Sequence, residues 1–334
     1  MILAPLFLFA AAATFEDSFR AGLIALQRND LKTAQTELAA ASKLAPGNGR
    51  VWIALAQTYR KLNEFALANE AAAKAEQLGA KDTVVLTSLV IFYNEAGQTF
   101  RAAEVQARYA RLVPNDTAAR ERAETLYFEA AQPLLQQGKF SETIPILTSA
   151  SKAIPASAQL QLALGVACYG LRRFDDAAAA FLKTIALAPE IPQPYLFLGK
   201  FLDQVPARLP EITKRFVAFE RANPDNFSGY YLHAKALNAQ SAEPETAMIL
   251  LRKAAAMNDR DAEVHFELGS VLDHLRQFSE AAAEFEKAAS LDPNDGATHY
   301  RLSRVYDRLG KPEAAEAERT KHAALEQAAR GAKN

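Results

Sequence analysis

The chain has 334 residues, and its 38 Lys and Arg residues nearly balance 39 Asp and Glu residues, which leaves a formal net charge of −1. Binding to nucleic acid needs a basic face, so this balance argues against a nucleic-acid partner. The 14 Gly and 15 Pro residues are too few for the turns of an all-β protein, while Ala, the best helix former, makes up about a fifth of the chain. We therefore expect an all-α protein, built as two globular domains or as one elongated array.

The first thirteen residues, MILAPLFLFAAAA, form an unbroken apolar stretch. A membrane-spanning helix needs about 20 such residues, so no membrane span is expected. The length of the stretch and the small residues at its end are typical of a secretory signal, although no Lys or Arg precedes it. We expect residues 1–14 to be a signal peptide and the protein to be exported, to a periplasmic or extracellular space. The alternative is a helix that caps the first repeat, in which case the protein is cytoplasmic.

Segments that end at a proline or close to one recur along the chain with a period of about 34 residues. Three strong copies are FEDSFRAGLIALQRNDLKTAQTELAAASKLAP (15–46), AQLQLALGVACYGLRRFDDAAAAFLKTIALAP (158–189) and AEVHFELGSVLDHLRQFSEAAAEFEKAASLDP (262–293). Within each copy, apolar or small residues recur at spacings of three and four on both sides of a polar break, which is the pattern of two amphipathic helices. The sequence therefore predicts one helix–turn–helix unit repeated along the chain.

This pattern resembles the tetratricopeptide repeat, a 34-residue helix–turn–helix unit. The resemblance rests on small residues such as Gly165 and Gly269 in the first helix, on Ala177 and Ala281 in the second, and on Pro at the repeat end. It implies an all-α fold, an α-solenoid of nine repeats over residues 15–330 that forms a right-handed superhelix and ends in an extended C-terminal capping helix. The repeats are expected to begin near residues 15, 49, 83, 124, 158, 192, 227, 262 and 296.

Two departures from the period predict local irregularities. Seven extra residues at 117–123, TAARERA, are helix formers and predict a long helix that begins near Thr117, with a bend at Pro133. In the sixth repeat, Pro206 and Pro210 predict a stretched turn between the two helices.

The resemblance also implies where a ligand binds, because repeat proteins of this family hold peptides in a concave groove lined by their first helices. The fifth position of the first helix, which faces this groove, is apolar or aromatic in every repeat except the third, which has Thr87. No repeat has Lys at this position, so the family's clamp for peptide C-termini is not expected. An apolar stripe that grips a peptide of mixed charge is one interpretation, and simple covering of the neighbouring helix is the other. The candidate groove residues are Phe128, Leu162, Tyr169, Lys200, Tyr231, Lys235, Phe266, Tyr300 and Arg304.

Motifs for catalysis or for metal binding are not found in the sequence. The lone Cys168 is expected to be a buried small residue, and His265 and His299, at the fourth position of consecutive repeats, are expected to serve packing because a third metal ligand is missing. We therefore expect a non-catalytic scaffold for protein–protein interaction, with a protein or peptide partner and no cofactor or metal. The alternative is a structural subunit docked permanently in a larger cytosolic or envelope complex. The partner's identity and the oligomeric state leave no mark in the sequence.

Overall fold

The computed structural model describes residues 14–331, so the apolar stretch predicted to be a signal peptide lies, up to residue 13, outside the described residues. Helices and the turns between them account for all of the described part, which contains no strand. No helix within residues 14–331 combines the length and the apolar character that crossing a membrane requires.

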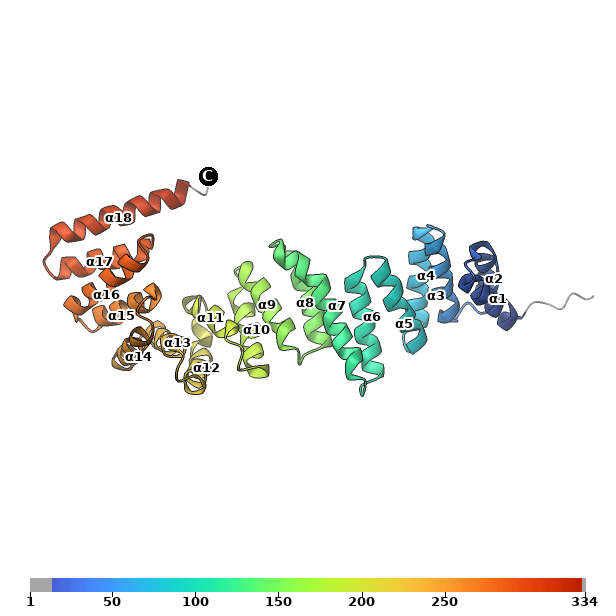
Figure 1. The fold of residues 1–334 in the computed structure, drawn as a ribbon, viewed down its shortest axis with the longest axis horizontal. Coiled ribbons are helices and arrows are strands. Elements are labelled where there is room, and N and C mark those ends of the chain that lie inside the picture. Colours follow the sequence, from blue (N-terminus) through green and yellow to red (C-terminus); the bar gives the residue numbers. More distant parts are fainter. Residues whose placement is uncertain (1–13, 332–334) are drawn as a thin grey trace, which may run out of the picture. The chain divides into compact units, whose positions relative to one another are not determined.

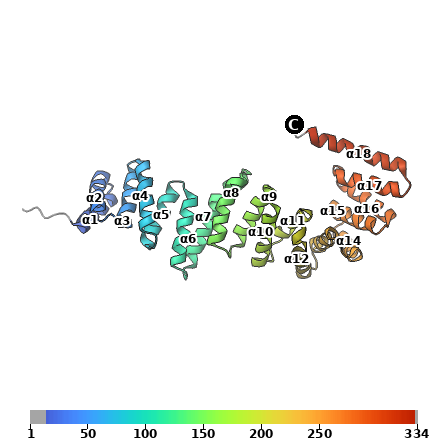
Figure 2. The ribbon, with the colours of Figure 1, turned by 180° about the vertical axis from the view of Figure 1, so that it is seen from behind.

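The chain divides into two compact units, Met1–Ala167 and Cys168–Asn334. The boundary falls inside helix α9 (Ala158–Gly170), so each unit is described by itself. In the first unit, successive helices pair as antiparallel hairpins, which Figures 1 and 2 show from two sides. The helices that complete this unit are α1 (Phe15–Gln27), α2 (Leu31–Leu44), α3 (Gly49–Lys61), α4 (Phe65–Leu78), α5 (Thr83–Glu95), α6 (Thr99–Leu112), α7 (Thr117–Gln136) and α8 (Phe140–Ala153).

Short polar side chains fix where the first helix of a repeat begins. Asn48 and Asp82 precede α3 and α5, and their side-chain oxygens accept hydrogen bonds from backbone N–H groups of the first turn. Such caps satisfy N–H groups that have no partner inside the helix. The turn between the two helices of a repeat holds a residue with positive φ, such as Asn63 or Gly97. The regular spacing of caps and turns therefore reproduces the 34-residue period in the backbone.

The core of the first unit combines very small residues at helix contacts with large residues between repeats. Ala34, Ala68 and Ala102 lie at the start of the second helices and are fully buried. Tyr93 and Tyr127 are almost fully buried and fill the space between neighbouring hairpins. Burial of side chains of this size stabilises the fold by roughly 1.5–3 kcal/mol each. Each hairpin thus depends on its neighbours for stability.

The seven extra residues of the fourth repeat extend its first helix, as predicted. Helix α7 begins at Thr117, is capped by Asp116, and continues through Pro133 to Gln136. Pro133 is exposed, so the carbonyl that loses its hydrogen bond lies near solvent.

The second unit continues the same alternation of first and second helices (Figure 1). Its sixth repeat has the predicted stretched turn: α11 ends at Gly199, and two short 3₁₀ turns, η1 (Leu202–Gln204) and η2 (Pro206–Arg208), lead into α12. The helices are α10 (Phe174–Leu187), α11 (Gln193–Gly199), α12 (Leu209–Ala222), α13 (Phe227–Ala239), α14 (Pro244–Met257), α15 (Ala262–His274), α16 (Phe278–Leu291), α17 (Gly296–Arg308) and α18 (Pro312–Gly331).

Candidate functional site

The groove residues predicted in the first unit are mostly structural in their surroundings. Phe128 of α7 is half-buried and packs against the core of this unit, and Leu162 of α9 is also half-buried. The more open apolar surface lies elsewhere, where Phe65 is 58% exposed and Ile91 is 51% exposed. These two side chains line a cavity of about 510 Å³ together with Leu26, Gln57, Arg60, Lys61, Asn63, Phe92 and Glu95.

In the second unit, Tyr169 belongs to a cluster of rings. Its ring centroid lies 5.5 Å from those of Phe197 and Phe201 and 6.1 Å from that of Phe174. The side chain is half-buried, so its ring serves packing at least as much as ligand binding. Lys200 is exposed beside this cluster, with its ammonium 5.7 Å from the ring of Phe197.

Tyr231 and Lys235 form a polar network between α13 and α15. The Tyr231 hydroxyl donates to Glu263 at 2.6 Å and accepts from Lys235 at 2.7 Å, and Lys235 lies 3.5 Å from Glu267. Burial, together with the hydrogen bond to Glu263, raises the pKa of Tyr231 far above its ordinary value. Only 8% of Tyr231 is exposed. Lys235, with about a quarter of its side chain exposed, is therefore the member of this pair that a ligand would reach.

The remaining predicted residues lie on α15 and α17. Phe266 is half-buried and meets Phe285 edge to face, with 5.7 Å between ring centroids. Tyr300 is 43% exposed, and the guanidinium of Arg304, one turn further on, lies 5.9 Å from its ring. Of the nine predicted residues, Tyr300 is the aromatic side chain that is most open to solvent.

A polar cavity of about 680 Å³ opens between α13, α15 and α17. Arg276, Arg301 and Arg308 converge on it. Arg308 forms an ion pair with Asp273, whereas Arg276 and Arg301 have no ion-pair partner within residues 14–331. The cavity is lined by Asn238, Ser270, Asp273, His274, Arg276, Phe278, Arg301 and Arg308. The lining therefore carries three guanidinium groups and one carboxylate, an excess of positive charge.

We call the surface made by Lys235, Tyr300, Arg304 and the lining of this polar cavity the first-helix face of the second unit. Arg301 and Arg308 lie on α17, the same first helix as the candidate groove residue Arg304, whereas nothing in the sequence pointed to Arg276. Arg276 lies in the turn between α15 and α16 with a φ of 61°, outside the helical register from which groove positions are counted. The positive φ of Arg276 is what sets it apart, and a backbone angle cannot be read from a sequence.

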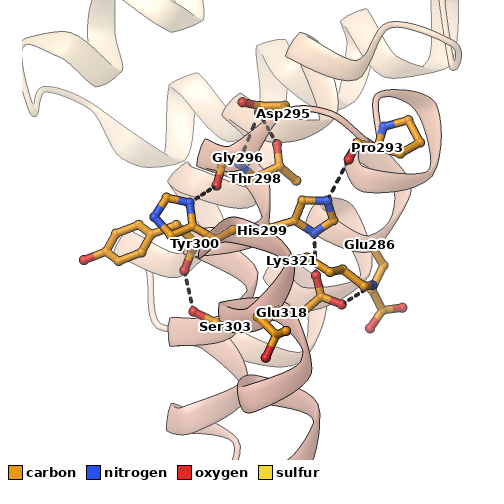
Figure 3. Close-up of polar contacts among 12 residues, drawn as sticks. Glu286, Pro293, Asp295, Gly296, Thr298, His299, Tyr300, Ser303, Glu318 and Lys321 are labelled. Atoms are coloured by element: carbon orange, nitrogen blue, oxygen red, sulfur yellow. Dashed lines mark hydrogen bonds and ion pairs between the residues drawn. The ribbon is translucent and has the colours of Figure 1, made fainter. Parts of the chain in front are cut away.

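A second cavity of the same unit, of about 520 Å³, lies against α16, α17 and α18 and contains the most elaborate polar cluster (Figure 3). His299 lies between the Glu318 carboxylate, 2.5 Å from Nδ1, and the Pro293 carbonyl, 3.0 Å from Nε2. Tyr306 donates to Glu286 at 2.7 Å, and burial with this contact raises the pKa of Tyr306. Both ring nitrogens of His299 therefore lie at hydrogen-bond distance from groups of the protein itself.

Cys168, His265 and His299 were expected to serve packing rather than chemistry. Cys168 is buried, and its burial raises the pKa of the thiol, which disfavours the reactive thiolate. His265 and His299 each contact a glutamate of the following helix, and no cluster of three or more potential metal ligands occurs among residues 14–331.

Three segments of the chain are similar to a known repeat family. Family models described as "Tetratricopeptide repeat" match residues 19–83, 128–191 and 262–295. A search of curated proteins found no match. Similar solved structures include TTC0263, a tetratricopeptide repeat protein of Thermus thermophilus (23% identity, 51% of this chain and 91% of that chain, TM-score 0.44), and PilF of Pseudomonas aeruginosa (18%, 60% and 90%, 0.46). A crystal structure of MamA is also similar (19%, 61% and 92%, 0.35).

The family matches fall on the first and second, the fourth and fifth, and the eighth of the repeats inferred from the sequence. The described residues form helix pairs throughout, which confirms the prediction of an all-α solenoid. These three segments therefore carry tetratricopeptide repeats, which supports a scaffold for protein interaction.

Proposed function

We propose that this scaffold binds an extended or helical peptide of mixed charge along the first-helix face of its second unit, without catalysis of its own. The observation that carries the proposal is the polar cavity of about 680 Å³, where Arg276 and Arg301 have no acidic partner within residues 14–331. Guanidinium groups bind carboxylates in a planar, two-pronged geometry. An acidic side chain of the peptide therefore fits this cavity.

The neighbouring parts of the same face supply two further kinds of contact. Tyr300 offers an exposed ring, which gives a large contact area at low conformational cost. Lys235 is held close to Glu263 and Glu267, so this end of the face presents both charges. A peptide with acidic, apolar and basic residues in succession fits this order better than a uniformly charged polymer does.

Photo-crosslinking tests this proposal in cells that make the protein. A photoreactive phenylalanine analogue replaces Tyr300 in one variant and Ile249 in a control variant. Ile249 is 63% exposed but lies on α14, a second helix, away from the first-helix face. We expect covalent adducts from position 300 that disappear when Arg276→Ala and Arg301→Ala are added. Adducts that form from position 249 and not from position 300 would overturn the assignment of the binding face.

Export is part of the proposal, because residues 1–13 combine a short apolar core with small residues at its end. The test is the sequence of the N-terminus in protein recovered from its native cells. A mature chain that begins near residue 13 or 14 is expected, and a chain that keeps Met1 would contradict export.

The alternative, a structural subunit docked in a larger complex, is favoured by apolar side chains that are exposed on second helices. Ile249 and Phe65 are 63% and 58% exposed. Exposed apolar surface of this kind marks interfaces when it forms a contiguous patch. Under this alternative, the native particle isolated from cells remains large at high salt and loses its partners on Ile249→Asp or Phe65→Asp rather than on Arg301→Ala.

A further inference from the structure

The fourth position of the first helix has the same task in several repeats: its side chain donates a hydrogen bond to the carbonyl six residues earlier, in the turn that precedes the helix. Trp52 Nε1 donates to the Pro46 carbonyl at 2.8 Å, and the Tyr195 hydroxyl donates to the Pro189 carbonyl at 3.0 Å. Tyr230 makes the same bond, at 2.9 Å, to the Pro224 carbonyl. Each of these side chains has a single donor, and it is used to tie a helix to its entry turn.

In the last two repeats a histidine occupies this position. His265 Nε2 lies 3.0 Å from the Asp259 carbonyl, as His299 Nε2 lies 3.0 Å from the Pro293 carbonyl. An imidazole has a second nitrogen, and in both residues it meets a carboxylate: Nδ1 of His265 lies 2.6 Å from Glu284. Figure 3 shows the His299 ring held between the Pro293 carbonyl and the Glu318 carboxylate. Both rings are buried, at 6% and 4% exposure.

Each of these two histidines faces two acceptors, a backbone carbonyl and a carboxylate, so the number of N–H donors that the ring can offer matters. A backbone carbonyl only accepts, and an ionised carboxylate only accepts, whereas a neutral imidazole has one N–H to give. Two acceptors at hydrogen-bond distance therefore require a second proton on the histidine–carboxylate pair. We propose that His265 and His299 are doubly protonated in the folded protein, and that loss of this proton loosens the last two repeats, which makes the second unit sensitive to pH near neutrality.

The groups that face His299 place the second proton on the ring rather than on the carboxylate. From α18, Glu318 also accepts a hydrogen bond from Lys321 at 2.7 Å. Burial by itself raises the pKa of Glu318, but the hydrogen bonds from Lys321 and His299 outweigh it, and the net pKa is lowered. Glu286 of α16 and Tyr306 of α17 line the same cavity and are paired with each other. Glu318 is therefore the carboxylate that holds the ring.

Around His265 the surroundings are similar, with one difference. Glu284 of α16 faces Nδ1, and the Asp259 carbonyl, from the turn after α14, faces Nε2. The Asp259 carboxylate lies 3.8 Å from Lys287, also of α16. Asp259 stands where the other repeats of this set have proline, so its side chain adds a negative charge near this ring.

Two features of the chain serve as internal controls. His233 also has a carboxylate partner, with Nδ1 2.6 Å from Glu220, but its Nε2 has no hydrogen bond within residues 14–331. A neutral ring with its proton on Nδ1 satisfies this contact. All five histidines lie in the second unit, so the first unit, at residues 14–167, has none of these pairs.

Loss of the proton leaves a buried acceptor without a donor, and such a group is costly to keep buried. Because the two hydrogen bonds of the folded unit require this proton and the open form does not, opening becomes more favourable as the pH rises. One such group changes an opening equilibrium at most about tenfold per pH unit.

Hydrogen exchange of the full chain, measured by mass spectrometry at about pH 6, 7 and 8 and corrected for intrinsic exchange rates, tests the proposal. We expect the opening constants of amides in α15–α18 to rise at least threefold between the lowest and highest pH, while those of the first unit stay unchanged. In Glu318→Gln, the amide can donate to a neutral ring, so the rise in α17 and α18 should disappear. His233→Gln keeps a donor for Glu220 and lies in α13, outside α15–α18, so it is the matched control and should behave as the wild type.

A direct measurement keeps the proposal testable even if Glu318→Gln folds poorly. Nitrogen NMR of isotope-labelled histidine in the wild-type chain distinguishes a doubly protonated ring from either neutral form. Two rings with both nitrogens protonated at about pH 7 are expected. Neutral forms for all five histidines, or a pH response in α15–α18 that matches that of the first unit, would overturn the proposal.

Discussion

The close approach of α15 and α16 at Gly269 makes a sharp prediction for Gly269→Ala. A Cβ atom at this position would lie 2.9 Å from Cδ1 and 3.0 Å from Cε1 of Phe285, closer than normal contacts allow. Phe285 is fully buried, so its ring has no open space into which to move. Overpacking of this kind costs about 1–3 kcal/mol, while Ala gains about 1 kcal/mol over Gly in a helix interior. We expect a net loss of about 1 kcal/mol, or roughly a fivefold higher local opening constant.

Hydrogen exchange over residues 262–291 of the full chain is the suitable assay, because a repeat array does not unfold in a single cooperative step. Phe285→Leu is destabilising on its own, but it removes the clashing ring. The double variant with Gly269→Ala should therefore be more stable than the sum of the two single changes, by at least about 0.5 kcal/mol. Gly47→Ala is the control, since nothing lies within 4 Å of a Cβ atom at that exposed position. A Gly269→Ala variant as stable as the wild type would refute the close-packing argument.

Further predictions concern three sites of the first unit. Asp82→Ala removes the cap of α5 and the ion pair with Arg50, and should lower the free energy of local opening around α5 by about 1–2 kcal/mol in hydrogen exchange. Asp82→Asn keeps the cap and should cost less. The hydrogen bond from Arg50 lowers the pKa of Asp82, so the stability this carboxylate contributes is present at neutral pH and is lost as the pH falls below about 4; an acid titration in which Asp82→Asn responds as the wild type does would contradict this. Pro133→Ala restores a helical hydrogen bond at an exposed site of α7 and should raise the free energy of local opening of α7 by up to about 3 kcal/mol in hydrogen exchange. An unchanged or lower value would show that the proline is already accommodated. Gly97→Ala forces alanine to a φ of 72° and should cost about 1 kcal/mol in the same assay, and a neutral result would mean that the turn rearranges.

The fold was predictable because every repeat needs small residues where its two helices meet, and these residues recur at a fixed spacing in the sequence. Ala177 and Ala281, which are fully buried, recur where two helices must approach closely, and that spacing is readable without a structure. The long helix α7 was predictable for a related reason, since an insertion of helix formers in register extends a helix rather than breaking it. Pro206 and Pro210 also predicted the stretched turn correctly, because Pro206 begins a 3₁₀ turn and Pro210 lies in the first turn of α12, where proline is tolerated.

The candidate site was less predictable, because counting positions along a helix does not give the depth at which a side chain lies. Tyr231 and Tyr300 stand at the same position of their repeats, yet 8% of the first and 43% of the second are exposed. The difference arises from the neighbouring first helix: Glu263 of α15 accepts from Tyr231, while α17 is followed by no further first helix within the described residues. Counting helix positions also misses Arg276, because this residue reaches the polar cavity from a turn and not from a helix.

The fourth position of the first helix shows how a repeat fold can acquire a new property without changing its architecture. Trp52, Tyr195 and Tyr230 use this position to donate one hydrogen bond from the helix to its entry turn. His265 and His299 keep the same bond, but their second nitrogen recruits a carboxylate from the following helix. Because the two bonds together need two protons, the packing of these two repeats becomes coupled to protonation. The same repeats provide Arg301 and Arg276 to the polar cavity, so a ligand that needs both repeats closed would bind them with a pH dependence of the same sign.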